Sequence, residues 1–304
     1  MENKNFIEWF SGFVDAEGCF HIKSKTMSNG NKRYYFEFVI KLHIDNVLLV
    51  KFIHETLGIG RIAIRSNSNS CTFEVGSEKD LRILIDLLDK CPLIGAKVLD
   101  FLSFKKAFFF YFDRPGLVTD EIIDAIEKIR NNHNTRRTDF KLPLDFKSSI
   151  TDYKLLGLFE GDGSFVIQTQ SLTPKFEIEL TEVQKLLLNE IQKYLINYFL
   201  GLGLSLEQLE KAIKIQDLKA KGNSKATVRL TITGIDFLNN YFNVYLKKLQ
   251  FFSDKSKDFE IFCTICESLF NKAHINNKEV KNSLLNLAKG MNNARYSTAK
   301  NLDE

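Results

Sequence analysis

The chain has 304 residues, of which 44% are hydrophobic and 26% are charged. This composition excludes a disordered chain, and the length suffices for two domain-sized cores. The formal net charge is only +4, so total charge does not identify a polyanion partner, and a surface for one must be a local face. The longest apolar run, Ala107 to Phe112, is too short to cross a bilayer. We therefore expect a soluble intracellular protein without membrane contact.

The chain has five cysteines, an odd number, and they lack the regular spacing of a disulfide framework. This favours a reducing compartment. The one CxxC pair, Cys263 and Cys266, lies in an apolar stretch with helical spacing. A zinc site of this kind needs a second ligand pair. Core packing is therefore the prediction for these two thiols.

In chain order, the first feature is a segment that occurs twice. Apolar residues spaced three and four apart predict helices over Phe6 to Glu17 and, half a chain later, over Asp152 to Asp162. Each helix ends on a carboxylate, Glu17 or Asp162, followed at once by a glycine. We expect those glycines, Gly18 and Gly163, to be left-handed C-cap residues.

Small residues recur four apart within both copies: Gly12 and Ala16 in the first, Gly157 and Gly161 in the second. This spacing places them on one helix face and permits close helix contact. If the two faces pack together, Glu17 and Asp162 become neighbours at a pseudo-twofold axis. The alternative is that each glycine is a tolerated defect in an ordinary core helix.

After each terminal glycine the apolar period changes to two, which predicts a strand. Further strands are predicted at 35–43, 61–65, 72–76, 175–181, 212–217 and 227–233, and amphipathic helices at 47–57, 78–88, 183–195 and 234–246. Each half therefore reads helix, two strands, helix, two strands, helix. The fold class is α+β.

One face of each predicted sheet stays polar. The candidate DNA-binding residues are His21, Lys23, Lys25, Tyr35, Glu37, Lys41, His43, Arg61, Arg65, Ser164, Gln168, Gln170, Lys175, Glu177, Lys214, Gln216, Arg229 and Thr231. Interleaved basic, amide and hydroxyl side chains suit contacts to base edges and phosphates in a major groove. For any single residue, an ordinary solvated sheet face is an equal alternative.

Between the halves the sequence predicts a turn at 113–116, a short helix at 120–130 and a polar, basic linker. The predicted organisation is a first half over 1–130, a linker over 131–150 and a second half over 151–304. Arg136 and Arg137 lie in the linker, and we expect solvent rather than phosphate around them.

Together these features resemble the LAGLIDADG homing endonucleases in their single-chain form with two fused copies. Residues 10–18 match the nine-residue family motif with Glu17 replacing its last Asp, and residues 155–163 match it again. The resemblance implies two pseudo-symmetric αββαββα halves, each with a four-stranded antiparallel DNA-binding sheet, packed through the two LAGLIDADG helices.

The resemblance also implies a metal-dependent active site. Glu17 and Asp162 would bind Mg²⁺, with Mn²⁺ or Ca²⁺ able to substitute in binding, and the carbonyls of Ala16 and Gly161 would complete the shell. Magnesium prefers such oxygen ligands together with phosphate, and it can polarise a phosphate and lower the pKa of a water. Asp15 and Glu160 point elsewhere, because two residues correspond to about 200° of helix rotation.

Two segments, 92–101 and 255–259, resemble the family segment that carries a basic residue near the active site. Lys97 and Lys255 share the spacing Lys-x-x-Asp-Phe and would stabilise charge on the scissile phosphates or orient water. Lys257 is an alternative in the second half. A surface cation near a helix end is the competing interpretation for each lysine.

The function that this resemblance implies is a staggered double-strand break at a long DNA target, made by a monomer through phosphodiester hydrolysis. Residues 273–274 and 291–298 are similar to fungal mitochondrial intron-encoded members, which implies a mitochondrial location. Alternatives within the family are an RNA maturase that binds its host intron RNA and a DNA-binding protein without cleavage. An aspartic protease is disfavoured, since its acids lie in Asp-Thr/Ser-Gly loops of an all-β fold.

Overall fold

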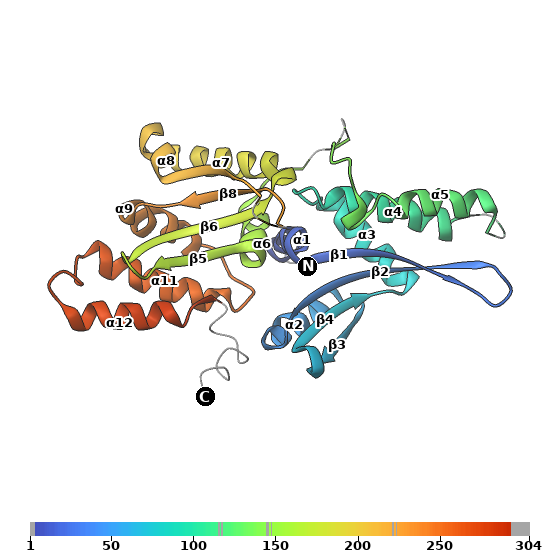
Figure 1. Ribbon diagram of the computed structural model, residues 1–304, viewed down its shortest axis with the longest axis horizontal. Coiled ribbons are helices and arrows are strands. Elements are labelled where there is room, and N and C mark those ends of the chain that lie inside the picture. Colours follow the sequence, from blue (N-terminus) through green and yellow to red (C-terminus); the bar gives the residue numbers. More distant parts are fainter. Residues whose placement is uncertain are drawn as a thin grey trace. The chain divides into compact units, whose positions relative to one another are not determined.

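The computed structural model describes residues 4–292 apart from 115, 117, 144, 145, 147, 221 and 223, and it divides into two compact units, residues 1–149 and 150–304. Each unit contains a four-stranded antiparallel sheet, with strand order β1-β2-β4-β3 in the first and β5-β6-β8-β7 in the second (Figure 1). The α+β class and the pseudo-symmetric repeat predicted from the sequence are confirmed.

The first unit follows the predicted element order and continues with two further helices. Its elements are α1 (Lys4–Glu17), β1 (Gly18–Thr26), β2 (Lys32–His43), α2 (Val47–Leu57), β3 (Arg61–Arg65), β4 (Ser70–Val75), α3 (Glu78–Lys90), α4 (Val98–Phe112) and α5 (Asp120–Arg130). α5 packs against α4. β2 is longer than its pairing with β4: residues 32–37 pair with β1 alone, and pairing with β4 begins at residue 38.

The second unit repeats this order with one extra short helix. Its elements are α6 (Asp152–Asp162), β5 (Gly163–Gln168), β6 (Thr173–Thr181), α7 (Lys185–Leu200), α8 (Leu206–Ala212), β7 (Ile213–Leu218), β8 (Thr227–Ile232), α9 (Ile235–Phe237), α10 (Asn243–Lys247), α11 (Lys255–Phe270) and α12 (Lys278–Lys289). A π-helical turn, Leu238–Phe242, joins α9 to α10, where the sequence predicted one continuous helix. α12 packs against α11 as α5 packs against α4.

Aromatic side chains hold α4 and α11 against the first strand of each sheet. The Phe20 ring in β1 lies 5.6 Å from that of Phe101 in α4. In the second unit, Phe165 in β5 lies 5.4 Å from Phe259 and 5.1 Å from Phe262 in α11. Buried aromatic pairs of this kind add about 1 kcal/mol beyond area burial. Each sheet therefore fixes the helix that begins at or directly after a candidate lysine.

The glycines after the two acids have a different role from the one predicted. Neither Gly18 nor Gly163 has a positive φ, and each is the first residue of a strand, so the left-handed C-cap prediction is wrong. A Cβ on Gly163 would lie 2.6 Å from the Phe159 carbonyl oxygen, and one on Gly18 would lie 2.7 Å from Val14 Cγ1. Close approach of the strand to the preceding helix, rather than backbone handedness, requires glycine here.

Cys263 and Cys266 are both buried in α11. Burial raises the pKa of the Cys263 thiol to about 11 and that of Cys266 to about 12. The prediction of core packing is confirmed. In the described part of the chain, no helix combines the length and apolar character that a membrane span requires.

Candidate active site

Two acids end helices that turn directly into strands. Glu17 is the last residue of α1 before β1, and Asp162 is the last residue of α6 before β5. Glu17 is partly exposed and Asp162 is exposed, so both carboxylates can be reached from solvent. The direct helix-to-strand junction fixes the backbone on both sides of each carboxylate.

A lysine reaches the backbone beside each acid. The Lys97 Nζ donates to the carbonyl oxygen of Ala16 at 2.8 Å. The Lys255 Nζ donates to the carbonyl of Gly161 at 3.3 Å and also to that of Gly163. Both ammonium groups therefore lie against the carbonyl of the residue immediately before the acid.

The structure also shows which of two neighbouring lysines, Lys255 or Lys257, contacts the backbone beside Asp162. The Lys257 Nζ forms an exposed ion pair with Asp254 at 3.0 Å, one turn earlier along the chain. Lys255, rather than Lys257, therefore makes the contact that matches Lys97.

The second acid of each copy binds the loop that carries the lysine. Asp15 accepts the backbone N–H groups of Ile94 and Gly95 at 2.6 and 3.0 Å. In the second unit, Glu160 accepts those of Phe252 and Ser253 at 3.0 and 2.6 Å. Asp15 and Glu160 are only 5% and 4% exposed. In each unit the two N–H groups that donate these charge-assisted hydrogen bonds belong to the residues three and two positions before the lysine.

Part of the predicted linker belongs to this site in the first unit. Arg137 Nε donates to Asp100 Oδ1 at 2.9 Å and its Nη2 to the Leu99 carbonyl at 2.8 Å. The Arg137 side chain is only 7% exposed, so the expectation of a solvated residue is wrong for it. Arg136, in contrast, is exposed and donates a hydrogen bond to Asn131 Oδ1 at 3.4 Å. Sequence reasoning missed Arg137 because its partner, Asp100, is distant along the chain.

The donor atoms at each acid fit a hard divalent cation. Each half offers one carboxylate and the adjacent carbonyl oxygen of Ala16 or Gly161, and oxygen is the ligand type that Mg²⁺ prefers. A carbonyl oxygen has two lone pairs, so the contact from lysine leaves it capable of a second interaction. No group of three or more His, Cys, Asp or Glu among the described residues forms a metal cluster.

The candidate DNA-binding residues of the first half lie on one face of its sheet. Lys23 is opposite Tyr35, His21 is opposite Glu37, and Arg65 is opposite Ser70. Alternation along each strand places the rest beside them. The residues on this face are His21, Lys23, Lys25, Tyr35, Glu37, Lys41, His43, Arg61 and Arg65.

The second sheet gathers its candidates in the same way, with one exception. Ser164, Glu177, Thr231 and Lys214 form a single row across all four strands. Gln168, Lys175, Gln216 and Arg229 occupy the same face. Gln170 lies in the turn after β5, outside the sheet.

Two acidic residues that were not among the candidates bind arginine side chains on these faces. Glu74 in β4 accepts Arg61 Nε and Nη2 at 3.0 and 2.8 Å, and Thr72 Oγ1 at 2.8 Å. Burial acts to raise the pKa of Glu74, but the hydrogen bonds from Thr72 and Arg61 lower it overall below its ordinary value. Glu179 binds Arg229 similarly, at 2.9 Å from its Nε. Period-two alternation in the predicted strand 72–76 would have placed Glu74 on this face.

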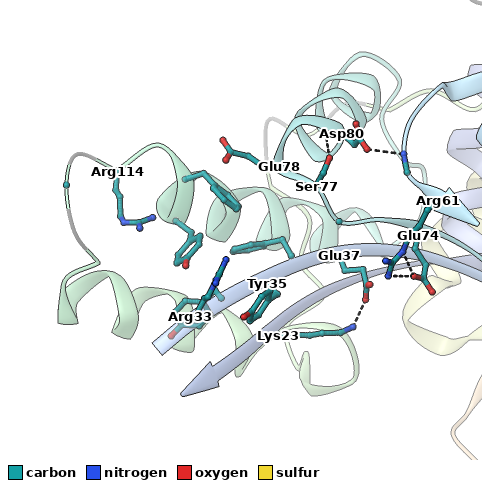
Figure 2. A pocket seen from close by; sticks show the side chains of 17 residues that line it. Lys23, Arg33, Tyr35, Glu37, Arg61, Glu74, Ser77, Glu78, Asp80 and Arg114 are labelled. Atoms are coloured by element: carbon teal, nitrogen blue, oxygen red, sulfur yellow. Dashed lines mark hydrogen bonds and ion pairs between the residues drawn. The ribbon is translucent and has the colours of Figure 1, made fainter. Parts of the chain in front are cut away.

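A pocket of about 990 Å³ opens at the edge of the first polar face. Figure 2 shows Lys23 extended toward Glu37 and Arg61 against Glu74, with Arg114 on the far side. Lys23 and Arg61 thus pair with carboxylates, whereas Arg33 and Arg114 lie over the rings of Tyr35 and Tyr111. This arrangement holds the basic side chains in set directions, which suits selective polar contacts more than uniform attraction to a polyanion.

Residues 10–108 and 155–266 match the model of the LAGLIDADG endonuclease family. The chain belongs to this family. The two matched regions begin in α1 and α6, which are therefore the LAGLIDADG helices. The resemblance to the LAGLIDADG family that the duplicated motif indicated is confirmed.

Two curated fungal proteins are among the relatives. The chain is 30% identical over 196 residues to a probable intron-encoded endonuclease, Cox1-I1b, of Schizosaccharomyces pombe, covering 64% of this chain and 50% of that protein. It is 23% identical over 317 residues to the uncharacterized mitochondrial protein RF1 of Saccharomyces cerevisiae, covering 100% of this chain and 63% of that protein. The chain thus spans between half and two thirds of the length of these two relatives.

Among solved structures, the chain is similar to the LAGLIDADG homing endonuclease I-GzeII, crystallised in complex with its DNA target. The TM-score is 0.79 at 22% sequence identity, and the match covers 95% of this chain and 99% of that one. At this identity the similarity establishes the LAGLIDADG fold.

Proposed function

We propose that this LAGLIDADG protein is a site-specific endonuclease that makes a staggered double-strand break in a long DNA target. One observation carries the proposal: the same set of contacts surrounds a helix-end acid in both units. Each set consists of the carboxylate, a lysine that donates to the carbonyl of the residue before it, and a second acid that accepts backbone N–H groups of the loop before the lysine. Two matched half-sites fit a reaction that must be carried out once on each DNA strand.

In this proposal Glu17 and Asp162 bind Mg²⁺ through their carboxylates, with the carbonyl oxygens of Ala16 and Gly161 as further donors. Mn²⁺ or Ca²⁺ can substitute in binding because both accept oxygen ligands. When bound, the cation supplies electrostatic stabilisation of the charge that develops on the scissile phosphate. The oxygen-only donor set at each acid supports this assignment.

Lys97 and Lys255 each bring a positive charge beside the scissile phosphate. Their Nζ atoms are held within hydrogen-bonding distance of the carbonyl that precedes the acid. An ammonium group retains further N–H donors after one such contact, and these can donate to a phosphate oxygen or to the attacking water. A fixed donor of this kind contributes about 10²- to 10³-fold to the rate.

The polar faces of the two sheets bind the target. Base recognition requires donors and acceptors in fixed directions, and the Arg61–Glu74 and Arg229–Glu179 pairs supply them. The exposed lysines of the same faces suit phosphate contacts, which give affinity that falls with salt. The I-GzeII complex with its DNA target supports duplex DNA as the partner.

We place the protein in the mitochondrion, as a monomer with both half-sites in one chain. Two fungal relatives, one named as an intron-encoded endonuclease and one as a mitochondrial protein, support this location. The duplicated site within one sequence supports the monomer.

The test is a cleavage screen of the purified chain against a library of intron-junction DNA, with and without Mg²⁺. We expect a specific double-strand product that requires the cation, is abolished by Glu17→Gln, and is reduced to nicking or lost in Asp162→Asn. Glu8→Gln is the matched control, because Glu8 lies in the same helix α1, two and a half turns before Glu17, and forms an i,i+4 pair with Lys4. Unchanged cleavage by both site variants would overturn the proposal.

A further inference from the structure

Three residues after each lysine, an aspartate accepts a hydrogen bond from a distant backbone N–H. Asp100, in the first turn of α4, accepts the backbone N–H of Asn134 at 2.9 Å. Asp258, in the first turn of α11, accepts that of Asn292 at 3.0 Å. Asp258 is 1% exposed, and a buried carboxylate requires partners of this kind.

The same two asparagines bind the strand that follows each helix-end acid. Asn134 Nδ2 donates to the Phe20 carbonyl at 2.6 Å, and Asn292 Nδ2 donates to the Phe165 carbonyl at 2.9 Å. Both asparagines have a left-handed backbone, with φ of 52° and 56°. Asparagine tolerates this region better than most residues, so the residue type suits both the backbone and the hydrogen bond.

We call each arrangement an Asn clasp: Asn134 with Phe20 and Asp100, and Asn292 with Phe165 and Asp258. Each clasp joins the strand that leaves the acid to the helix that begins at the lysine. Lys97 and Lys255 make a second attachment, from the start of each lysine helix to the carbonyl of Ala16 or Gly161, two residues before the strand begins. Two separated attachments fix the helix against the strand in both distance and rotation.

Further side chains reinforce each clasp in a different way. In the first unit, His133 Nε2 lies 2.7 Å from the Phe20 carbonyl oxygen. In the second, Ser164 Oγ donates to Asn292 Oδ1 at 3.2 Å. The asparagine contacts are shared by the two units while their reinforcement differs, which singles out the asparagines as the common requirement.

We propose that Asn134 and Asn292 are positioning residues for cleavage, each holding the lysine of its own half at the acid. This inference rests on the proposed function and deepens it. Misplacement of a reacting group by about 1 Å can cost about 10²-fold in rate. Because each clasp lies within one unit, its loss acts on the half-site of that unit.

The test uses Asn134→Gly and Asn292→Gly. Glycine keeps the left-handed backbone and the N–H to the aspartate, so only the carboxamide contact is lost. Asn276→Gly is the matched control, since Asn276 also has a positive φ, 58°, and is exposed. If a glycine variant does not fold, Asn134→Asp and Asn292→Asp keep the side-chain shape while replacing the donor with an acceptor.

The readout is the single-turnover rate for each labelled strand of a DNA target, with affinity measured separately in EDTA. We expect Asn134→Gly to slow one strand and Asn292→Gly the other, each at least tenfold, with affinity within twofold of wild type. A purely structural role would slow both strands together or weaken binding. Equal slowing of both strands, or an unchanged rate, would refute the inference.

Hydrogen exchange of the DNA-free protein separates this inference from the proposed function. In Asn134→Gly, amides over 18–24 and 93–101 should lose protection while the second unit keeps it. If the wild-type chain cuts no target, the proposed function fails, and this exchange result still decides whether the clasp holds the two elements together. Unchanged protection over both segments would overturn the clasp itself.

Discussion

Replacing Asp15 by Asn should destabilise the first unit measurably. Asp15 accepts two backbone N–H groups, from Ile94 at 2.6 Å and from Gly95 at 3.0 Å, and is 5% exposed. Asparagine has the same shape, but only one of its terminal atoms is an acceptor. One N–H therefore keeps a weaker neutral partner and the other faces an amide donor.

The magnitude follows from those two bonds. Hydrogen bonds to charged groups contribute about 1.5–3 kcal/mol, and leaving a buried N–H without an acceptor costs about 1–3 kcal/mol. We therefore expect Asp15→Asn to lower the free energy of unfolding by about 3 kcal/mol. Glu160→Gln should act similarly in the second unit, where Glu160 holds two N–H groups in the same way.

Urea unfolding monitored by tryptophan fluorescence suits this measurement. Trp9 is the single tryptophan of the chain, and it is fully buried in α1 beside Phe13, so its emission reports the first unit. Asp86→Asn is the control, because Asp86 is exposed and forms an exposed i,i+4 ion pair with Lys90. If the free energy of unfolding of Asp15→Asn lies within 0.5 kcal/mol of this control, a range typical of surface changes, the role of Asp15 in holding the loop before Lys97 is refuted.

Three further predictions follow from other contacts. Gly163→Ala should lower the free energy of unfolding by about 1–3 kcal/mol, as overpacking does. Gly76→Ala should be tolerated, since an added Cβ would lie 3.9 Å from its nearest atom; thermal unfolding of both variants measures the difference. Glu74→Gln should release Arg61, so that a binding titration shows weaker discrimination between targets and a steeper salt dependence. The pKa of Glu74 in the folded protein is lowered from 4.5, so its stabilising contribution is present above that pH and lost as the pH falls. The free energy of unfolding of wild type should therefore fall more steeply with acid than that of Glu74→Gln, and identical pH dependence would refute this. Because burial raises the pKa of Cys266 to about 12, its thiol should stay unlabelled by iodoacetamide at pH 8 until urea unfolds the protein, and immediate labelling would contradict it.

The duplicated motif allowed the fold to be predicted because it combines two physical patterns. The apolar period changes from helical to alternating at Gly18 and again at Gly163, and this change marks the junction where each acid lies. The prediction failed for the conformation of those glycines, since the close approach of Phe176 to Gly163 is a tertiary contact. Local sequence cannot distinguish a steric requirement for glycine from a conformational one.

The site residues divide in a similar way. Lys97 and Lys255 could be proposed from a local spacing, but the choice of Lys255 over Lys257 required the position of the Gly161 carbonyl. Asn134 and Asn292 could not be found from the sequence, because each joins elements that are distant along the chain. Arg137 was missed for the same reason.

The most direct test of the central claim is cleavage by the double variant Glu17→Gln/Asp162→Asn. The target is one that the wild-type chain cuts in Mg²⁺, labelled on both strands, and binding is first verified in EDTA. The two-acid account predicts that the variant binds this DNA and breaks neither strand. Cleavage of both strands at the wild-type rate would contradict it.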